Sequence, residues 1–161
     1  MGGLWTEEAR YERWLKVELA ACEALAEVGI VPKKAAETIR KKAKVNPARV
    51  EEIESVTRHD VAAFVQAAGE TIGDEASRWF HYGMTSSDVL DTAFALALVE
   101  AADIILDDLE KLGKVIARLA KKHRDTPMIG RSHGVHAEPV TFGFVLASWF
   151  SEVGRCVHRM K

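Results

Sequence analysis

The longest uninterrupted helical stretch of the sequence constrains the fold most. Residues 87–122 contain no proline, and Gly113 is their only glycine. Hydrophobic residues recur there at heptad spacing over three heptads, at Leu98, Ala102, Ile105, Leu109, Leu112, Ile116 and Leu119. About 35 residues with a rise of about 1.5 Å each make a rod about 50 Å long. Such a rod buries its hydrophobic seam only against partner helices, so the pattern predicts a helical bundle.

Shorter helices are expected before and after this rod. The N-terminal ones should begin at Thr6, Lys33, Asn46 and Asp60, and end at Gly29, Lys42, about Val56 and near Gly73. A loop from His123 to about Ala137 should precede a last helix that starts at Pro139. Strands have little support, because no sustained alternation and no Asn-Gly or Asp-Gly turn is present. The sequence therefore predicts an all-α chain, with an N-terminal helical domain over 1–87 and the first, incomplete part of a central helical bundle over 88–161.

Composition and charge exclude several classes of protein. Hydrophobic residues make up 48% and charged residues 29% of the 161 residues, a balance that excludes a disordered chain. The net charge of −2 argues against a nucleic-acid partner. The sequence has neither an apolar run long enough to cross a membrane nor a signal peptide at its start. Cys22 and Cys156 form no metal or disulfide pattern, so we expect a cytoplasmic protein.

Three short polar segments interrupt the helical pattern, and the first is Thr57-Arg58-His59-Asp60-Val61. Arg58 offers a planar guanidinium suited to a phosphate or carboxylate, and His59 can transfer a proton near neutral pH. An ordinary helix cap with solvated flanks explains the same residues, and Asp60 is the expected cap.

The second segment is His81-Tyr82-Gly83-Met84-Thr85-Ser86-Ser87-Asp88. Its consecutive hydroxyl residues precede the long helix, where free backbone N–H groups favour an anion. Capping needs only one of these hydroxyls, and the surplus favours binding.

The third segment runs from Gly130 to Pro139, with the sequence GRSHGVHAEP. His133 and His136 suit acid–base chemistry or metal binding. A metal site is the weaker alternative, because neither cysteines nor a His-Glu-x-x-His pattern support it.

In order and spacing, these three segments resemble the signature segments of the adenylosuccinate lyases, within the fumarase/aspartase superfamily. The resemblance extends over essentially the whole chain, including Leu4-Trp5-Thr6-Glu7 and the helix that ends at Gly29. It implies elimination of fumarate from adenylosuccinate, giving AMP, and from the succinyl-carboxamide ribotide of purine synthesis. It implies a nucleotide substrate, no metal or other cofactor, and a homotetramer whose active sites each draw on three subunits.

The resemblance also implies a role for each matching residue. His133 takes the position of the general acid, and His59 the position that assists it and contacts the substrate. Arg58 and Asp60 match substrate-binding positions. Thr85 and Ser86 match the residues that hold the succinyl carboxylate, and His81 matches a further active-site histidine, while His136 is left as a structural or supporting group.

Two parts of the family pattern are missing from the 161 residues. The catalytic base of the family is a serine in a Ser-Ser-x-Met-Pro-x-Lys loop, and no such loop is present. An Arg-Tyr nucleotide contact that precedes the family's Pro-Glu-Met stretch is also absent. We therefore expect a fragment of a larger enzyme that is inactive alone. Two alternatives stay open: another lyase of the superfamily, and a non-enzymatic helical interaction module.

Overall fold

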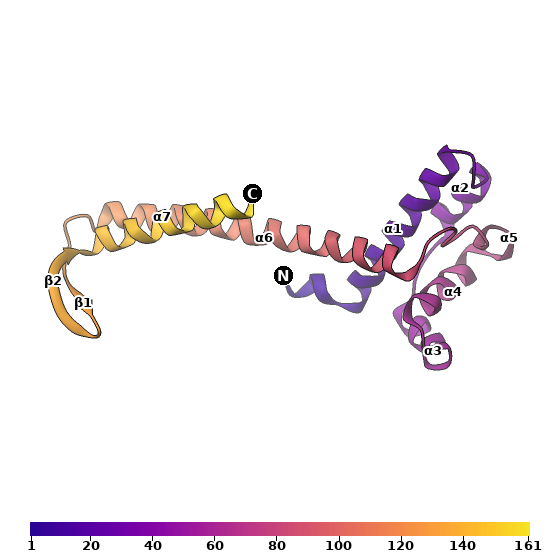
Figure 1. The fold of residues 1–161 in the computed structure, drawn as a ribbon, viewed down its shortest axis with the longest axis horizontal. Helices are drawn as coiled ribbons and strands as arrows, with labels where there is room; N and C mark the ends of the chain where they lie inside the picture. The colour runs from indigo at the N-terminus through magenta and orange to yellow at the C-terminus, as the bar shows by residue number, and fades with distance from the viewer. The chain divides into compact units, whose positions relative to one another are not determined.

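The computed structural model describes residues 1–161, and the chain forms two compact units, Met1–Glu100 and Ala101–Lys161. The elements in chain order are a short 3₁₀-helix (Gly2–Trp5), α1 (Glu7–Glu27), α2 (Lys33–Lys42), α3 (Pro47–Thr57), α4 (Asp60–Ile72), α5 (Asp74–Ser77), α6 (Ser86–Lys122), β1 (Pro127–Ser132), β2 (Val135–Thr141) and α7 (Phe142–Met160) (Figure 1). The predicted helical fold and the long helix are confirmed. The division between the units falls inside α6, and the domain boundary expected at residue 87 stays a prediction.

Side-chain caps fix where the first helices begin. The Thr6 hydroxyl accepts a hydrogen bond from the Ala9 N–H at 3.2 Å, and the Asn46 side chain accepts one from the Ala48 N–H at 3.1 Å. Each satisfies a backbone donor that the helix leaves free. These two predicted caps are therefore confirmed.

The core of the first unit is aromatic. Phe64 of α4 is fully buried and meets Trp14 of α1 edge-on, with ring centroids 5.3 Å apart. Tyr11 stacks on Phe64 at 6.0 Å and also meets Trp14 edge-on, with ring centroids 5.2 Å apart. The first turns of α6 join this core through Val89 and Ala93, both buried. The start of α6 is thus held by packing against the helices that precede it.

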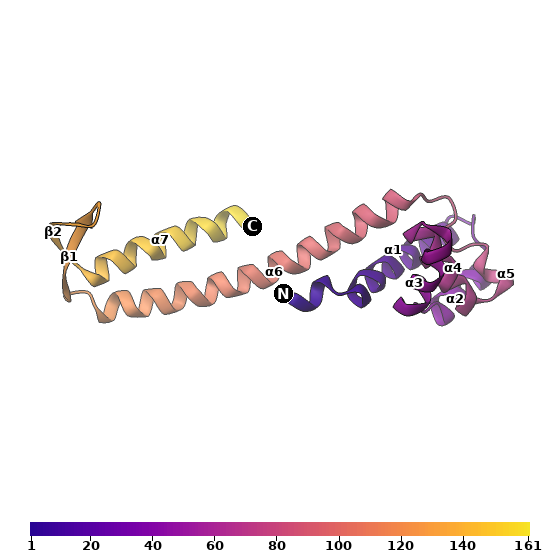
Figure 2. The same ribbon diagram turned by 90° about the horizontal axis from the view of Figure 1, so that it is seen from below.

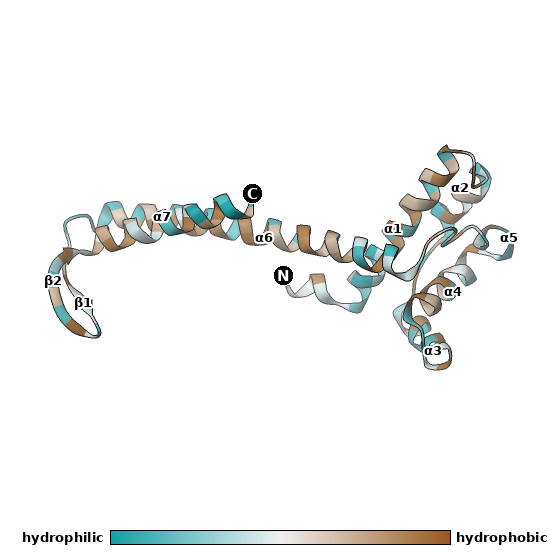
Figure 3. Cartoon of the chain, in the orientation of Figure 1, coloured by the Kyte–Doolittle hydropathy of each residue, from teal (hydrophilic) through white to brown (hydrophobic).

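In the second unit, α7 runs antiparallel to the later part of α6 (Figure 2). The Lys161 ammonium lies 3.4 Å from Glu110, whereas Gly143, at the other end of α7, packs against the Ala120 carbonyl. Two helices cannot enclose a hydrophobic seam, and Ile105 and Leu112 keep 40% and 46% of their surface exposed. Hydrophobic residues remain visible along α6 (Figure 3). No helix in the chain is both long enough and apolar enough to span a membrane.

The expected loop before α7 is instead an antiparallel hairpin of β1 and β2. The prediction that strands were unsupported, and that a helix starts at Pro139, was wrong here. Pro139 lies in β2 opposite Ile129, in a two-stranded sheet that tolerates a residue without an N–H. The helix begins at Phe142, because Thr141 caps it by accepting from the Phe144 N–H at 3.2 Å.

Candidate functional site

Each of the three polar segments contains one non-glycine residue in the left-handed backbone region. These residues are Arg58 (φ 56°), His81 (φ 62°) and His133 (φ 53°), and no other non-glycine residue in the chain has a positive φ. Side chains disfavour this conformation, which therefore persists only where the surroundings impose it, and it concentrates at functional sites. The backbone thus singles out the same three segments that the sequence did.

The first segment joins α3 to α4. Arg58 ends α3, with its N–H bonded to the Glu54 carbonyl at 2.8 Å. The residue that caps α4 is His59, whose Nδ1 accepts from the Ala62 N–H at 3.3 Å. The expectation that Asp60 is this cap was wrong: Asp60 is the first helical residue, and its carboxylate accepts from the Val61 N–H at 2.7 Å.

The cap determines which nitrogen of His59 is available for chemistry. Because Nδ1 accepts a backbone hydrogen, a neutral His59 ring carries its proton on Nε2. The side chain is half exposed, so this Nε2–H is free to donate to a ligand. The backbone therefore orients the ring and selects its tautomer.

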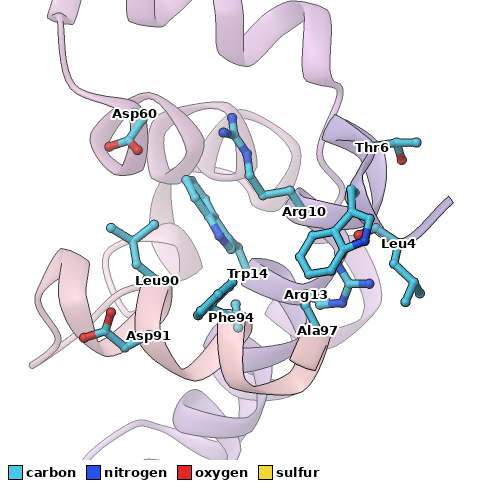
Figure 4. A pocket seen from close by; sticks show the side chains of 12 residues that line it. Leu4, Thr6, Arg10, Arg13, Trp14, Asp60, Leu90, Asp91, Phe94 and Ala97 are labelled. Carbon is cyan, nitrogen blue, oxygen red and sulfur yellow. The ribbon is translucent and has the colours of Figure 1, made fainter. Parts of the chain in front are cut away.

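Asp60 lies at the edge of a groove of about 430 Å³ between α1, α4 and α6 (Figure 4). The groove is lined by Leu4, Trp5, Thr6, Arg10, Arg13, Trp14, Asp60, Leu90, Asp91, Ala93, Phe94 and Ala97. The Arg10 guanidinium stacks over the Trp14 ring at 5.1 Å, and its Nε is buried without a hydrogen-bond partner. Arg13 is fixed by an ion pair with Glu100 at 2.7 Å. Aromatic walls with fixed cations suit a flat or anionic ligand.

The second segment places His81 against a buried acid. Its Nδ1 lies 2.5 Å from Oε1 of Glu18, a residue of α1 that is 1% exposed. Burial raises the pKa of Glu18, and the hydrogen bond with His81 opposes that rise. Since Glu18 occupies Nδ1, only Nε2 of His81 remains for another partner.

At the start of α6 the Asp88 carboxylate accepts two hydrogen bonds from Thr85. The Thr85 N–H and hydroxyl both donate to Asp88 Oδ2, at 2.7 and 3.0 Å. These two bonds hold the pKa of Asp88 below its usual range. The hydroxyls of Ser86 and Ser87 make no hydrogen bond within this unit, so they are the groups left for a ligand at the helix N-terminus.

His133 lies at the tip of the hairpin in the second unit, whereas the other six predicted site residues lie in the first. His133 and Gly134 both have positive φ, 53° and 77°, as a tight two-residue hairpin turn requires. The side chain of His133 is exposed. His136 lies in β2 opposite Arg131, whose Nη2 is 3.4 Å from the His136 Nε2. The turn therefore presents His133 while the sheet holds His136.

Glu18 and the role of Asp88 were not predicted from the sequence. Both had a signal: Glu18 lies midway between Trp14 and Cys22 on the buried face of α1, and Thr85-Ser86-Ser87-Asp88 has the spacing of a capping box. No group of three or more histidine, cysteine, aspartate or glutamate residues in the chain is arranged to hold a metal ion.

Comparison with known proteins identifies the family. A family model described as a lyase matches residues 1–161. Over 155 residues the chain is 55% identical to an adenylosuccinate lyase of Synechocystis sp. (strain ATCC 27184 / PCC 6803 / Kazusa), covering 96% of this chain and 36% of that protein. It is 52% identical over all 161 residues to the adenylosuccinate lyase of Thermotoga maritima, covering 37% of it.

A solved structure agrees with this match. The crystal structure of a fumarate lyase from Mesorhizobium sp. BNC1 has a TM-score of 0.92 and 32% sequence identity, covering 99% of this chain and 38% of that one. The chain thus spans a little over a third of the proteins that it matches. Because the family model covers every residue, the chain belongs to this lyase family.

Proposed function

We propose that the chain contributes substrate binding and the general acid to an adenylosuccinate lyase. The observation that carries this proposal is 52–55% identity to two adenylosuccinate lyases over essentially the whole chain. The reaction eliminates fumarate from adenylosuccinate, leaving AMP, or from the succinyl-carboxamide ribotide. A base removes the proton beside a carboxylate, the C–N bond breaks, and an acid protonates the departing nitrogen.

His133 is the proposed acid. Its exposure at the tip of a tight turn supports this role, because a proton donor must reach the substrate. His59 assists through Nε2–H, the nitrogen that its capping bond leaves free. The base of the family is not among these residues, so residues 1–161 alone are proposed to be inactive.

The remaining residues bind the substrate. We assign the nucleotide phosphate to Arg58. Asp60, which lies at the edge of the aromatic groove, is assigned to substrate binding as well. The succinyl carboxylate gains charge during the elimination, and Thr85 and Ser86 at the start of α6 would hold it, since fixed donors and the helix dipole stabilise that charge. His81 completes the set through Nε2.

The assembly and setting of the whole enzyme are proposals as well. The exposed seam of Ile105 and Leu112 supports a homo-oligomer, and the family implies a tetramer in the cytoplasm. Each active site would then draw residues from more than one subunit. The non-enzymatic interaction module is set aside, because the chain belongs to a lyase family.

The substrate is tested with the full-length protein that carries this chain. We expect AMP and fumarate from adenylosuccinate, measured by chromatography, and no turnover of argininosuccinate or of fumarate with ammonia. Turnover of argininosuccinate, or of fumarate with ammonia, would instead assign the protein to another lyase of the superfamily. The 32% identity to a fumarate lyase structure is the reason to test this alternative.

The acid is tested by a matched histidine pair in the same protein. His133→Ala should lower kcat by about 10²- to 10⁴-fold with a much smaller change in KM, the scale expected for a proton donor. His136→Ala, three residues away, should do much less. Equal effects, or the reverse order, would contradict the assignment.

A further inference from the structure

Glu18 is a charged residue where the fold calls for a hydrophobic one. It lies on the inner face of α1, one turn from both Trp14 and Cys22, and it is 1% exposed. A carboxylate out of water is costly unless a partner compensates it. Such a residue therefore needs an explanation beyond packing.

The compensation is partial and comes from His81. Oε1 of Glu18 is 2.5 Å from Nδ1 of His81, whereas Oε2 is buried without a partner. The other charged group near the ring is Asp88, and the titratable group near Glu18 on α1 is Cys22. Buried ion pairs are weak sources of stability, because hydrophobic residues of similar volume often serve as well. Stability alone thus gives little reason for this pair.

The pair fixes both the position and the chemistry of His81. The residue has a left-handed backbone, and its side chain is 21% exposed, so the ring reaches solvent only in part. When Glu18 is ionised and the imidazole is neutral, Glu18 accepts from Nδ1–H, and Nε2 is left as a hydrogen-bond acceptor. An acceptor at that position suits a hydroxyl or amino group of a nucleotide.

We propose that Glu18 is a positioning residue for the elimination: it holds His81 as the Nδ1–H tautomer, with Nε2 presented to the substrate as an acceptor. Glu18 acts only through His81 and does not touch the substrate. This inference rests on the proposed function for its reaction, but the tautomer that it assigns is independent of which substrate is cleaved.

A double-mutant cycle in the full-length protein tests the coupling. Glu18→Gln keeps the shape and removes the charge, and we expect it to lower kcat/KM at least about tenfold. In a His81→Ala background Glu18→Gln should lower kcat/KM less than about twofold, because the imidazole that Glu18 positions is absent. The exposed Glu12→Gln on the same helix is the control and should change nothing. A similar loss in both backgrounds, or no loss in either, would overturn the proposal.

The ¹⁵N chemical shifts of the His81 ring provide a test that needs no turnover. We expect the Nδ1–H form in the unaltered protein and a shift toward Nε2–H in Glu18→Gln, since the amide can donate to Nδ1. An Nε2–H ring in the unaltered protein would overturn the inference. If instead the tautomer is as expected and adenylosuccinate is not cleaved, the positioning contact stands and the proposed substrate fails.

Discussion

The two units of the chain bury their hydrophobic residues to very different extents. Met1–Glu100 encloses an aromatic core in which Phe64 has no exposed surface. In Ala101–Lys161, by contrast, two long helices leave side chains such as Phe144 and Trp149 at least half exposed. A mixed set of short helices can surround a core, whereas a pair of helices has only one shared face. The first unit therefore has the means to fold on its own contacts, and the second needs further helices along its length.

The largest expected effect comes from a matched pair of phenylalanine substitutions in the 161-residue chain. Phe64→Ala should lower the free energy of unfolding of the first unit by about 3–5 kcal/mol, because it opens a cavity in a closed core. Phe144→Ala removes a side chain that is 69% exposed and should leave that transition unchanged. Urea unfolding followed by tryptophan fluorescence measures both, since Trp14 packs edge-on against Phe64 and reports on this core. Equal effects would remove the distinction between the units.

Association of the chain should depend on the seam of the second unit. Large exposed apolar surfaces drive self-association, so we expect oligomers in sedimentation at micromolar concentration. Lysine at both Ile105 and Leu112 should weaken association at least about a hundredfold, equivalent to about 2.7 kcal/mol. Asp103→Lys on the polar side of α6 is the control and should have little effect. A monomeric unaltered chain would contradict the interpretation of the seam.

Two glycines of α7 should respond to alanine with opposite signs. A Cβ on Gly143 would lie 2.6 Å from both the Ala120 carbonyl oxygen and the Arg124 Cα, so the backbone must move. We expect Gly143→Ala to cost about 1–3 kcal/mol. Gly154 has open space around it, and alanine there should stabilise the helix by about 0.5–1 kcal/mol. Thermal unfolding followed by circular dichroism measures the stability of both variants. A change of the same sign in both would show that the close backbone approach at Gly143 does not limit stability.

The two units also differ in how well the sequence predicted them. In the first unit, helix limits followed from caps such as Thr6 and Asn46, because a local hydrogen bond decides where a helix begins. In the second, the hairpin was missed: its turn is His133-Gly134 and not one of the usual Asn-Gly or Asp-Gly pairs, and a strand pairing is a contact between segments. The cap of α4 was misassigned because an imidazole nitrogen took the place expected for the Asp60 carboxylate.

The candidate site shows the same limit on sequence reasoning. Its motif residues were found from their types and order, and the three left-handed residues fall within those motifs. The Glu18–His81 contact joins residues 63 positions apart in the sequence, so the local pattern could mark Glu18 as unusual but could not name its partner.

The smallest expected effect concerns the start of α6, where capping and substrate binding must be separated. Thr85→Val nearly preserves shape but removes the hydroxyl that donates to Asp88, and because both groups are exposed it should lower the Tm only slightly at neutral pH. The pKa of Asp88 is lower in the folded protein than the ordinary aspartate value of 3.8. The ionised Asp88 carboxylate therefore stabilises the fold above pH 3.8, and this stabilisation is lost as the pH falls through the pKa of Asp88 in the folded protein. The difference in Tm between the variant and the unaltered protein should therefore shrink below about pH 4.

In the full-length protein the Thr85→Val variant distinguishes capping of α6 from binding of the succinyl carboxylate. If Thr85 also holds the succinyl carboxylate, Thr85→Val should lower kcat as well as stability, because the hydroxyl bond strengthens as charge develops. Ser86→Ala removes a hydroxyl with no hydrogen bond in its unit, so it should lower kcat without lowering Tm. A Thr85→Val enzyme that melts earlier yet turns over normally would leave Thr85 as a cap alone, with the carboxylate assigned to Ser86 and the helix N-terminus.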